Sequence, residues 1–329
     1  MRLGVVGARD VRSRRLAEVA VRYVREQYPD SPLRTDLARP IPELLVLIGD
    51  DRFFLDTLRD LDSRIAVLTI GDGFLAEASP EKVRESLASI MHGEHWIEKR
   101  LRLAAQMGDE SSPLALNEIA LSTRRGGGFL RYSLAIGGEN VWRDGGDGVV
   151  ICTPTGSTGY GLSAGGPIVM ENAEAIVIVP VCSANGQRPL VVPSNTIVEV
   201  SEVQSRSGCE LVIDGSVRIR LKSSGFSVRT ADQPVQFVRL GKARYLRTFG
   251  KLRTRQIGRE IPSEAAPSAK YVFRLLSDQG PLTEKQLLAE SGLPDRTVRS
   301  ALAYLMKEGF VRRSSSLKDA REAIFSLRR

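Results

Sequence analysis

The sequence of 329 residues is poor in the residues that build metal centres and disulfide frameworks, with two histidines and three cysteines. His92 and His95 alone cannot complete a tetrahedral zinc site, and no cysteine lies near them in sequence, so we expect no bound metal there. Cys152, Cys182 and Cys209 are odd in number and far apart, which favours buried thiols in a reducing cytoplasm over disulfide bonds.

Long hydrophobic runs are also absent. No apolar run reaches the roughly 18 residues that a membrane span needs. The first 30 residues lead from a short apolar segment directly into an amphipathic one, so no signal peptide is predicted. Hydrophobic residues make up 42% and charged residues 26% of the chain, which is ordinary for a globular protein. We therefore expect a cytoplasmic protein of two or three domains with no membrane partner.

Negative charge is scarce in the last quarter of the chain. Residues 242–329 hold 19 Lys and Arg against 9 Asp and Glu, a net charge of +10. Residues 1–241 hold 28 and 30, a net charge of −2. A basic module on a nearly neutral body favours a polyanionic partner. The alternative is a solvated basic surface that binds nothing.

The hydrophobic pattern divides the chain into parts. Strand-like and helix-like segments alternate over residues 1–114, which predicts an α/β domain with a parallel sheet. Short β-rich segments separated by Gly, Pro, Ser and Asn follow over residues 115–249, and they predict a mostly antiparallel sandwich or barrel. Residues 250–268 are basic and then rich in Pro, Ala and Ser, which is typical of a linker.

Residues 269–329 have the element order of a winged helix-turn-helix, with three helical segments followed by two strand-like ones. Thr283 and Gln286 form a capping box, and Gly309 ends the third helix. The outward face of that helix carries residues that could contact phosphates and base edges of double-stranded DNA, namely Arg296, Arg299, Ser300, Tyr304 and Lys307. The alternative is a helical module for protein interaction or dimerisation.

The most unusual composition lies at residues 147–167, where a strand over 149–152 leads into a loop of small residues. Five glycines and five Ser or Thr occur between Thr153 and Gly166. Glycine lets backbone N–H groups approach a ligand, and hydroxyls add donors and acceptors, so a ligand with sugar hydroxyls or phosphates is predicted. The Gly-x-Gly-x-x-Ala pattern at 159–164 lacks the later acidic residue of a dehydrogenase, so that activity is not predicted.

This segment resembles the signature of NAD kinases, which is Asp-Gly followed by Thr-Pro-Thr-Gly-Ser-Thr-Ala-Tyr and then Ser-Ala-Gly-Gly-Pro. The resemblance continues, in the family's order, at Asn117-Glu118, 187–193, Asp214-Gly215 and 245–252, and it covers about residues 2–255. It implies an α/β domain, a β-rich domain and a C-terminal return segment. It also implies phosphoryl transfer from ATP or polyphosphate to the adenosine-ribose 2′-hydroxyl of NAD, giving NADP, with Mg²⁺ or another divalent cation, in a homo-oligomer.

The resemblance implies roles for individual residues. The family's Gly-Gly-Asp-Gly-Thr loop holds nucleotide phosphates, and its Asp is the base on the 2′-hydroxyl; that Asp matches Asp50 here. Asp51 and Arg52 would face the phosphates, while Asn117 and Glu118 would contact a ribose and nearby polar groups. Further positions of the dinucleotide site match Asp147, Thr158, Gly159, Tyr160 and Ser163.

The phosphate side departs from the family pattern. Residues 48–52 read Ile-Gly-Asp-Asp-Arg, so Asp51 brings a negative charge where backbone should approach phosphates. Arg52 could offset that charge, and Asp50 with Asp51 could hold Mg²⁺. The stretch before Gly-Phe-Leu is shortened at 70–75, and the family's usual His is absent from 181–184.

Two functions stay open on these residues. One is an active NAD kinase with a DNA-binding tail, and the other is a catalytically weak or inactive regulator of transcription that senses NAD or NADP. A lipid kinase of the wider superfamily agrees less well with the complete dinucleotide signature.

Overall fold

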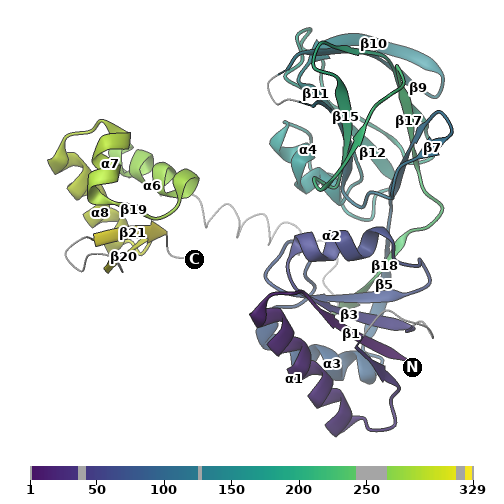
Figure 1. The fold of residues 1–329 in the computed structure, drawn as a ribbon. Helices are drawn as coiled ribbons and strands as arrows, with labels where there is room; N and C mark the ends of the chain where they lie inside the picture. The colour runs from purple at the N-terminus through teal and green to yellow at the C-terminus, as the bar shows by residue number, and fades with distance from the viewer. Residues whose placement is uncertain (1, 36–41, 125–127, 242–264, 316–322, 328–329) are drawn as a thin grey trace. The chain divides into compact units, whose positions relative to one another are not determined.

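The computed structural model describes residues 2–35, 42–124, 128–241, 265–315 and 323–327 (Figure 1). The chain forms two compact units, Met1–Lys242 and Ala243–Arg329. No helix in the described ranges is long and apolar enough to cross a membrane.

The first unit begins with a six-stranded sheet in the order β2-β1-β3-β4-β18-β5. Its strands are β1 (Leu3–Gly7), β2 (Leu33–Arg34), β3 (Leu44–Ile48), β4 (Ala66–Ile70), β18 (Val235–Leu240) and β5 (His95–Arg100). All neighbours pair in parallel except β18 and β5. The predicted parallel α/β arrangement is therefore present.

Helices cover both faces of this sheet (Figure 1). Helices α1 (Val11–Gln27) and α3 (Val83–Met91) pack with the alternate β3 residues Leu44, Val46 and Ile48. Helix α2 (Asp51–Arg59) packs with Leu45 and Leu47 on the other face. All five residues of β3 are buried, as expected for a strand covered on both sides.

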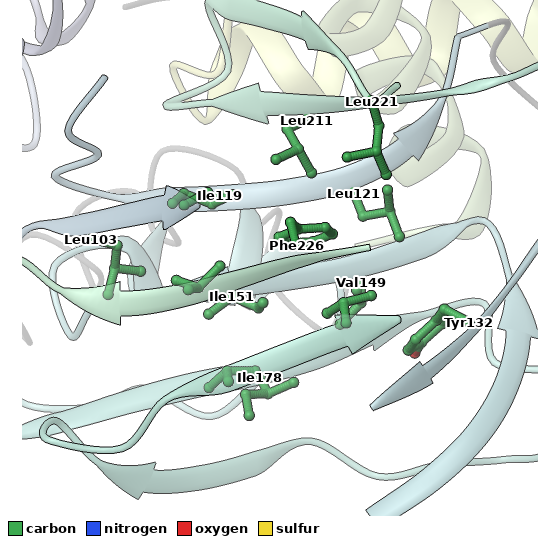
Figure 2. Close-up of a cluster of buried hydrophobic side chains, with 14 of the residues drawn as sticks. Leu103, Ile119, Leu121, Tyr132, Val149, Ile151, Ile178, Leu211, Leu221 and Phe226 are labelled. Carbon is green, nitrogen blue, oxygen red and sulfur yellow. The ribbon is translucent and has the colours of Figure 1, made fainter. Parts of the chain in front are cut away.

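Two antiparallel six-stranded sheets form the β-rich part of this unit. One has the order β10-β9-β14-β17-β6-β7, and the other β13-β12-β11-β8-β15-β16. The first comprises β10 (Glu139–Gly146), β9 (Leu130–Ile136), β14 (Val198–Ser205), β17 (Phe226–Thr230), β6 (Leu103–Met107) and β7 (Glu110–Ser111). The second comprises β13 (Leu190–Pro193), β12 (Ala175–Val181), β11 (Gly148–Cys152), β8 (Glu118–Thr123), β15 (Cys209–Ile213) and β16 (Val217–Arg220). Their inward side chains share one core (Figure 2), so this part is a sandwich.

The sheets divide the chain differently from the predicted boundaries at residues 114 and 249. Strands β6 and β7 precede residue 115 but belong to the sandwich, where β6 pairs with β17. Strand β18 lies inside the predicted β-rich segment but pairs with β4 and β5 of the first sheet. Hydrophobic alternation identifies a strand but not its partner, so the sequence does not reveal these two crossings between the sheets.

The described part of the second unit contains three helices and a three-stranded sheet of order β19-β21-β20. The elements are α6 (Pro267–Gln279), β19 (Leu282–Thr283), α7 (Glu284–Ser291), α8 (Asp295–Lys307), β20 (Val311–Ser315) and β21 (Ala323–Leu327). The Thr283–Gln286 capping box is confirmed. The apolar face of α8 is buried and comprises Val298, Ala301, Leu302 and Leu305. Residues 245–252 and most of the predicted linker lie outside the described residues.

Candidate active site

The glycine-rich signature loop packs directly on the Asn117-Glu118 segment. It runs from the end of β11 through a 3₁₀ turn (Gly156–Thr158) into the short helix α4 (Tyr160–Ser163). The Thr153 hydroxyl donates to the Leu116 carbonyl at 2.6 Å, and the Thr153 N–H donates to the Asn117 carbonyl at 2.9 Å. A Cβ on Gly156 would lie 2.1 Å from the Asn117 carbonyl oxygen, so only glycine permits this approach.

Asp214 holds the Asn117-Glu118 segment from below. Its buried carboxylate accepts hydrogen bonds from the backbone N–H groups of Leu116 (3.0 Å), Asn117 (2.7 Å) and Glu118 (3.1 Å). Asp214 has a φ of 46°, in the left-handed region that Asp tolerates better than most residues. The family resemblance includes Asp214-Gly215 but gives it no role. In the structure, the Asp214 carboxylate positions the backbone of residues 116–118.

Asn117, Glu118 and the signature loop together form one wall, which we call the dinucleotide wall. Glu118 is its strongest functional candidate. Its side chain is buried, and its Oε2 atom has no hydrogen-bond partner among the described residues. Burial, and secondly the nearby Asp214 charge, raise the pKa of Glu118 to about 8. A buried carboxyl group with an unused oxygen is poised to bind a ligand, and in its protonated form it can donate a hydrogen bond.

Cys152 lies opposite Glu118 in the β11–β8 pairing. Burial, together with the Glu118 charge, raises the pKa of the Cys152 thiol to about 12. Because the thiolate is the reactive form of cysteine, this buried thiol is a poor nucleophile. A Cβ on Gly161 would lie 2.8 Å from its sulfur, so the thiol packs against the start of α4. Cys209 is also buried, but Cys182 is exposed, so the prediction of buried thiols is wrong for Cys182.

The rim of the signature loop is open to solvent. Tyr160 is 45% exposed, and Ser163 and Asp147 are also exposed. Partial burial raises the pKa of Tyr160, and the charges of Asp147, Cys182 and Glu118 add to this effect. A Cβ on Gly159 would lie 3.8 Å from Glu118 Oε2. The structure therefore places Gly159 and Tyr160, at the rim of the loop, beside the buried Glu118 side chain.

Thr158 differs from its neighbours in the predicted dinucleotide site. It is buried, and its hydroxyl donates to the Thr155 carbonyl at 3.2 Å. Because its hydroxyl hydrogen is used inside the loop, Thr158 is better placed to stabilise the loop conformation than to donate a hydrogen bond to the dinucleotide.

Asp50 stands at the carboxyl edge of the parallel sheet, directly after β3. It caps the N-terminus of α2, where its Oδ1 accepts the Phe53 N–H at 2.9 Å. The side chain is exposed. Ligands of open α/β sheets bind outside this edge of the strands, so Asp50 is well placed to contact one.

Asp51 and Arg52 occupy the first turn of α2. The Asp51 Oδ2 accepts the Phe74 N–H at 2.7 Å, and its Oδ1 accepts the Leu75 N–H at 2.8 Å. Arg52 is exposed. The predicted magnesium pair of Asp50 and Asp51 gains no support, since Asp51 already uses both oxygens on backbone. Within the described ranges no group of three or more His, Cys, Asp and Glu could hold a metal ion.

The predicted nucleic-acid face of α8 is only partly available. Arg296, Ser300 and Lys307 are exposed. Arg299 is also exposed, but its Nε lies 2.6 Å from a Glu284 oxygen and its Nη2 lies 3.3 Å from Asp295. Tyr304 is half-buried and packs on the core of the second unit. Sequence spacing places these residues on one helix but cannot show such contacts with other parts of the unit.

Comparison with known proteins agrees with this geometry. The family described as "ATP-NAD kinase C-terminal domain" matches residues 116–240. An NAD kinase of Methanothermobacter thermautotrophicus is 35% identical over 223 residues, which cover 66% of this chain and 78% of that protein. The chain belongs to the NAD kinase family. An NAD kinase of Thermococcus gammatolerans is 32% identical over 219 residues, covering 65% of this chain and 79% of the relative.

Solved structures support the same NAD kinase fold. An NAD kinase from Archaeoglobus fulgidus in complex with ATP has a TM-score of 0.65 and 27% identity, covering 77% of this chain and 99% of that one. A yeast NADH kinase complexed with NADH has a TM-score of 0.69 at 20% identity, covering 81% and 90%, and this likeness concerns the fold alone.

A buried ionic network anchors the signature loop, and the sequence analysis did not predict it. Arg100 at the end of β5 is 1% exposed; its Nη1 donates to the Thr155 hydroxyl oxygen at 3.1 Å, and its Nη2 contacts Glu98 (2.8 Å) and Glu171. Arg239 of β18 pairs with Glu77 at 3.0 Å and also contacts Glu98. The network therefore ties the signature loop to the edge of the first sheet.

Proposed function

We propose that this chain is an NAD kinase that transfers the terminal phosphoryl group of ATP or polyphosphate to the adenosine-ribose 2′-hydroxyl of NAD, giving NADP. The observation that carries the proposal is the wall formed by Asn117, Glu118 and the signature loop, with Asp214 holding the backbone beneath it. Relatives named NAD kinase and the likeness to a kinase in complex with ATP support this reaction for the chain.

Asp50 is the proposed catalytic base. As the 2′-oxygen attacks the terminal phosphorus, its proton passes to the Asp50 carboxylate while the bond from phosphorus to the bridging oxygen of the donor breaks. The Phe53 N–H bond to Oδ1 fixes the direction of this side chain. A phosphoryl transfer of this kind needs little covalent chemistry from the protein, so positioning of the hydroxyl against the donor supplies most of the rate.

The dinucleotide contacts in this proposal come from Asn117, Glu118, Asp147, Tyr160 and Ser163. Glu118 offers a buried oxygen that has no hydrogen-bond partner among the described residues, which suits a ribose hydroxyl or another polar group of NAD. Tyr160 offers a partly exposed side chain to the ligand. Gly159 leaves room for the ligand beside Glu118, and Thr158 shapes the loop.

A divalent cation in the proposed reaction accompanies the donor phosphates. Mg²⁺ in phosphoryl-transfer sites is usually held by one or two carboxylates, waters and the phosphates themselves. Asp50 and Asp72 have exposed carboxylates at this edge of the sheet that would hold such an ion, with one Asp72 oxygen already paired with Arg12 at 2.6 Å. When bound, the cation would neutralise charge on the phosphates.

For the second unit, we propose a winged helix that binds double-stranded DNA. The order of the described elements, three helices and a β-ribbon, supports it, as do the exposed residues Arg296, Ser300 and Lys307 on α8. Arg299 and Tyr304 are less available than predicted, because one is ion-paired and the other packs on the core. Salt-dependent DNA binding that disappears on truncation at residue 265 would support this role. DNA binding that survives truncation would move the site to the first unit.

The competing function is a sensor of NAD or NADP that no longer turns over. The Asp51 carboxylate favours the sensor, because it accepts two backbone N–H groups in the loop where the donor phosphates would bind. Purified protein incubated with NAD, Mg²⁺ and either ATP or polyphosphate separates the two functions by the NADP formed. NADP formation supports the kinase. Its absence with both donors, while NAD or NADP still raises the melting temperature, supports the sensor.

A further inference from the structure

We propose that the Asp51 carboxylate fills an anion position made by the backbone N–H groups of Phe74 and Leu75, and so weakens binding of the donor's phosphate chain. Asp51 is thereby a residue that determines donor affinity. The inference rests on the proposed function, because it concerns the donor side of that site.

The geometry around Asp51 is that of a bound anion. Each carboxylate oxygen accepts a different backbone N–H, from Phe74 at 2.7 Å and from Leu75 at 2.8 Å. A Cβ on Gly73 would lie only 2.1 Å from Asp51 Oδ1, so the loop approaches the carboxylate as closely as glycine permits. The carboxylate also lies in the first turn of α2, where the helix dipole favours negative charge.

Consecutive backbone N–H groups that converge on one anion are a phosphate-binding arrangement as well as a carboxylate-binding one. The Asp51 side chain competes for these donors from within the same molecule, at a high effective concentration. A donor phosphate must therefore displace the carboxylate or bind without these two N–H groups. The first choice costs two charge-assisted hydrogen bonds, and the second forfeits them.

The negative charges near this loop also weaken binding of the donor phosphates. Asp50 and Asp72 place two further exposed carboxylates on the two loops, which meet where Gly73 packs on Asp51. Without a bound cation, these carboxylates repel a phosphate. The Arg12 guanidinium contacts Asp72 at 2.6 Å, so part of the positive charge near this loop is already paired. Arg52 is exposed on the same turn as Asp51 and supplies compensating charge for a donor. The negative charge of Asp51 adds to the repulsion of a polyphosphate.

The dinucleotide wall should not respond to Asp51. The backbone there is held by Asp214, through N–H groups of residues 116–118, and the signature loop is held by Arg100 through Thr155. Neither set includes Asp51, whose two oxygens are both bonded to the 74–75 backbone. Changes at Asp51 therefore act on donor affinity and leave NAD affinity alone.

The test is donor binding to Asp51→Gly and Asp51→Asn, measured by calorimetry with inorganic tripolyphosphate and Mg²⁺ and requiring no turnover. We expect Asp51→Gly to bind tripolyphosphate about tenfold more tightly than the wild type, since both N–H groups become available and a negative charge is removed. Asp51→Asn should bind at an intermediate strength, and NAD should bind all forms equally. Asp56→Asn, which removes an exposed charge from the same helix away from the loop, is the matched control and should leave tripolyphosphate binding unchanged.

Unchanged or weaker tripolyphosphate binding by Asp51→Gly would overturn the inference and make Asp51 a purely structural residue of the loop. If Asp51→Gly does not fold, Asp51→Asn decides, with tighter binding supporting the inference and unchanged binding overturning it. The proposed function fails separately, through absence of NADP in the wild type and both variants, whatever their tripolyphosphate affinities.

Discussion

The Glu118 backbone N–H donates to the Asp214 carboxylate at 3.1 Å, so one buried acidic residue positions another whose own side chain faces the proposed ligand. Burial raises the pKa of Asp214, although its three backbone hydrogen bonds oppose that rise. Burial raises the pKa of Glu118 to about 8, and the Asp214 charge adds to this effect. The pair therefore links the protonation of the site to the stability of the fold.

The first prediction concerns pH and Glu118→Gln. The native state keeps a proton on Glu118 that the unfolded state releases near the ordinary pKa of 4.5, so stability falls as pH rises from there through about 8. Gln carries no proton to lose, so the variant should lose less stability than the wild type between pH 6 and pH 9. Urea unfolding across that range measures the difference. Glu139→Gln, at an exposed position, is the control, and equal pH slopes for all three proteins would contradict the prediction.

The second prediction concerns Asp214→Ala. The change leaves three backbone N–H groups without their acceptor beneath the dinucleotide wall. We expect a loss of about 3 kcal/mol in the free energy of unfolding and weaker NAD binding. Asp214→Asn retains one acceptor oxygen and should lose less of both. Chemical denaturation and calorimetry with NAD are the measurements, and unchanged NAD affinity in a folded Asp214→Ala protein would refute the positioning role.

The third prediction concerns Arg100→Ala, which removes the centre of the buried ionic network. Glu98 and Glu171 would remain as partly buried charges without this partner, and Thr155 would lose its contact. We expect a loss of about 3–5 kcal/mol in stability. The KM for NAD should rise more than kcat falls, because the signature loop is displaced while Asp50 is not. Arg143→Ala breaks an exposed pair with Glu202 and should cost less than about 1 kcal/mol; equal losses in the two variants would argue against the network.

The fourth prediction separates two arginines of α8. Arg299 is held by Glu284 and Asp295, whereas Arg296 is exposed at the start of the same helix. Arg296→Ala should weaken binding to a mixed-sequence DNA duplex and reduce the salt slope by about 1. Arg299→Ala should change both quantities less. Fluorescence anisotropy over a salt series measures them, and the reverse order would mean that Arg299 leaves its partners when DNA binds.

The sequence predicts the parts of the site that are local in the chain. The glycine and hydroxyl content after β11 indicates a ligand loop, and the motif resemblance identifies Asn117 and Glu118. The support of that wall is not local, because Asp214 bonds to Asn117 across 97 residues and Arg100 reaches Thr155 across 55. Those contacts depend on strand pairing, which no periodicity in the sequence reports.

The loop around Asp51 is a second feature that the sequence predicts only in part. The sequence places an unexpected carboxylate at Asp51, and charge alone suggests repulsion or a cation site. Only the approach of the loop around Gly73 reveals that both carboxylate oxygens accept backbone N–H groups. The comparison with the family pattern therefore shows that Asp51 is unusual, but only the structure shows what its carboxylate does.

The most direct test of the proposed kinase is the rate of NADP formation by wild type and Asp50→Asn, with NAD affinity measured by calorimetry on the same samples. We predict that the wild type forms NADP with ATP or polyphosphate, and that Asp50→Asn binds NAD normally but turns over about 10²–10⁴-fold more slowly. A wild type that forms no NADP with either donor, or an Asp50→Asn variant that keeps the wild-type rate, would contradict the proposal.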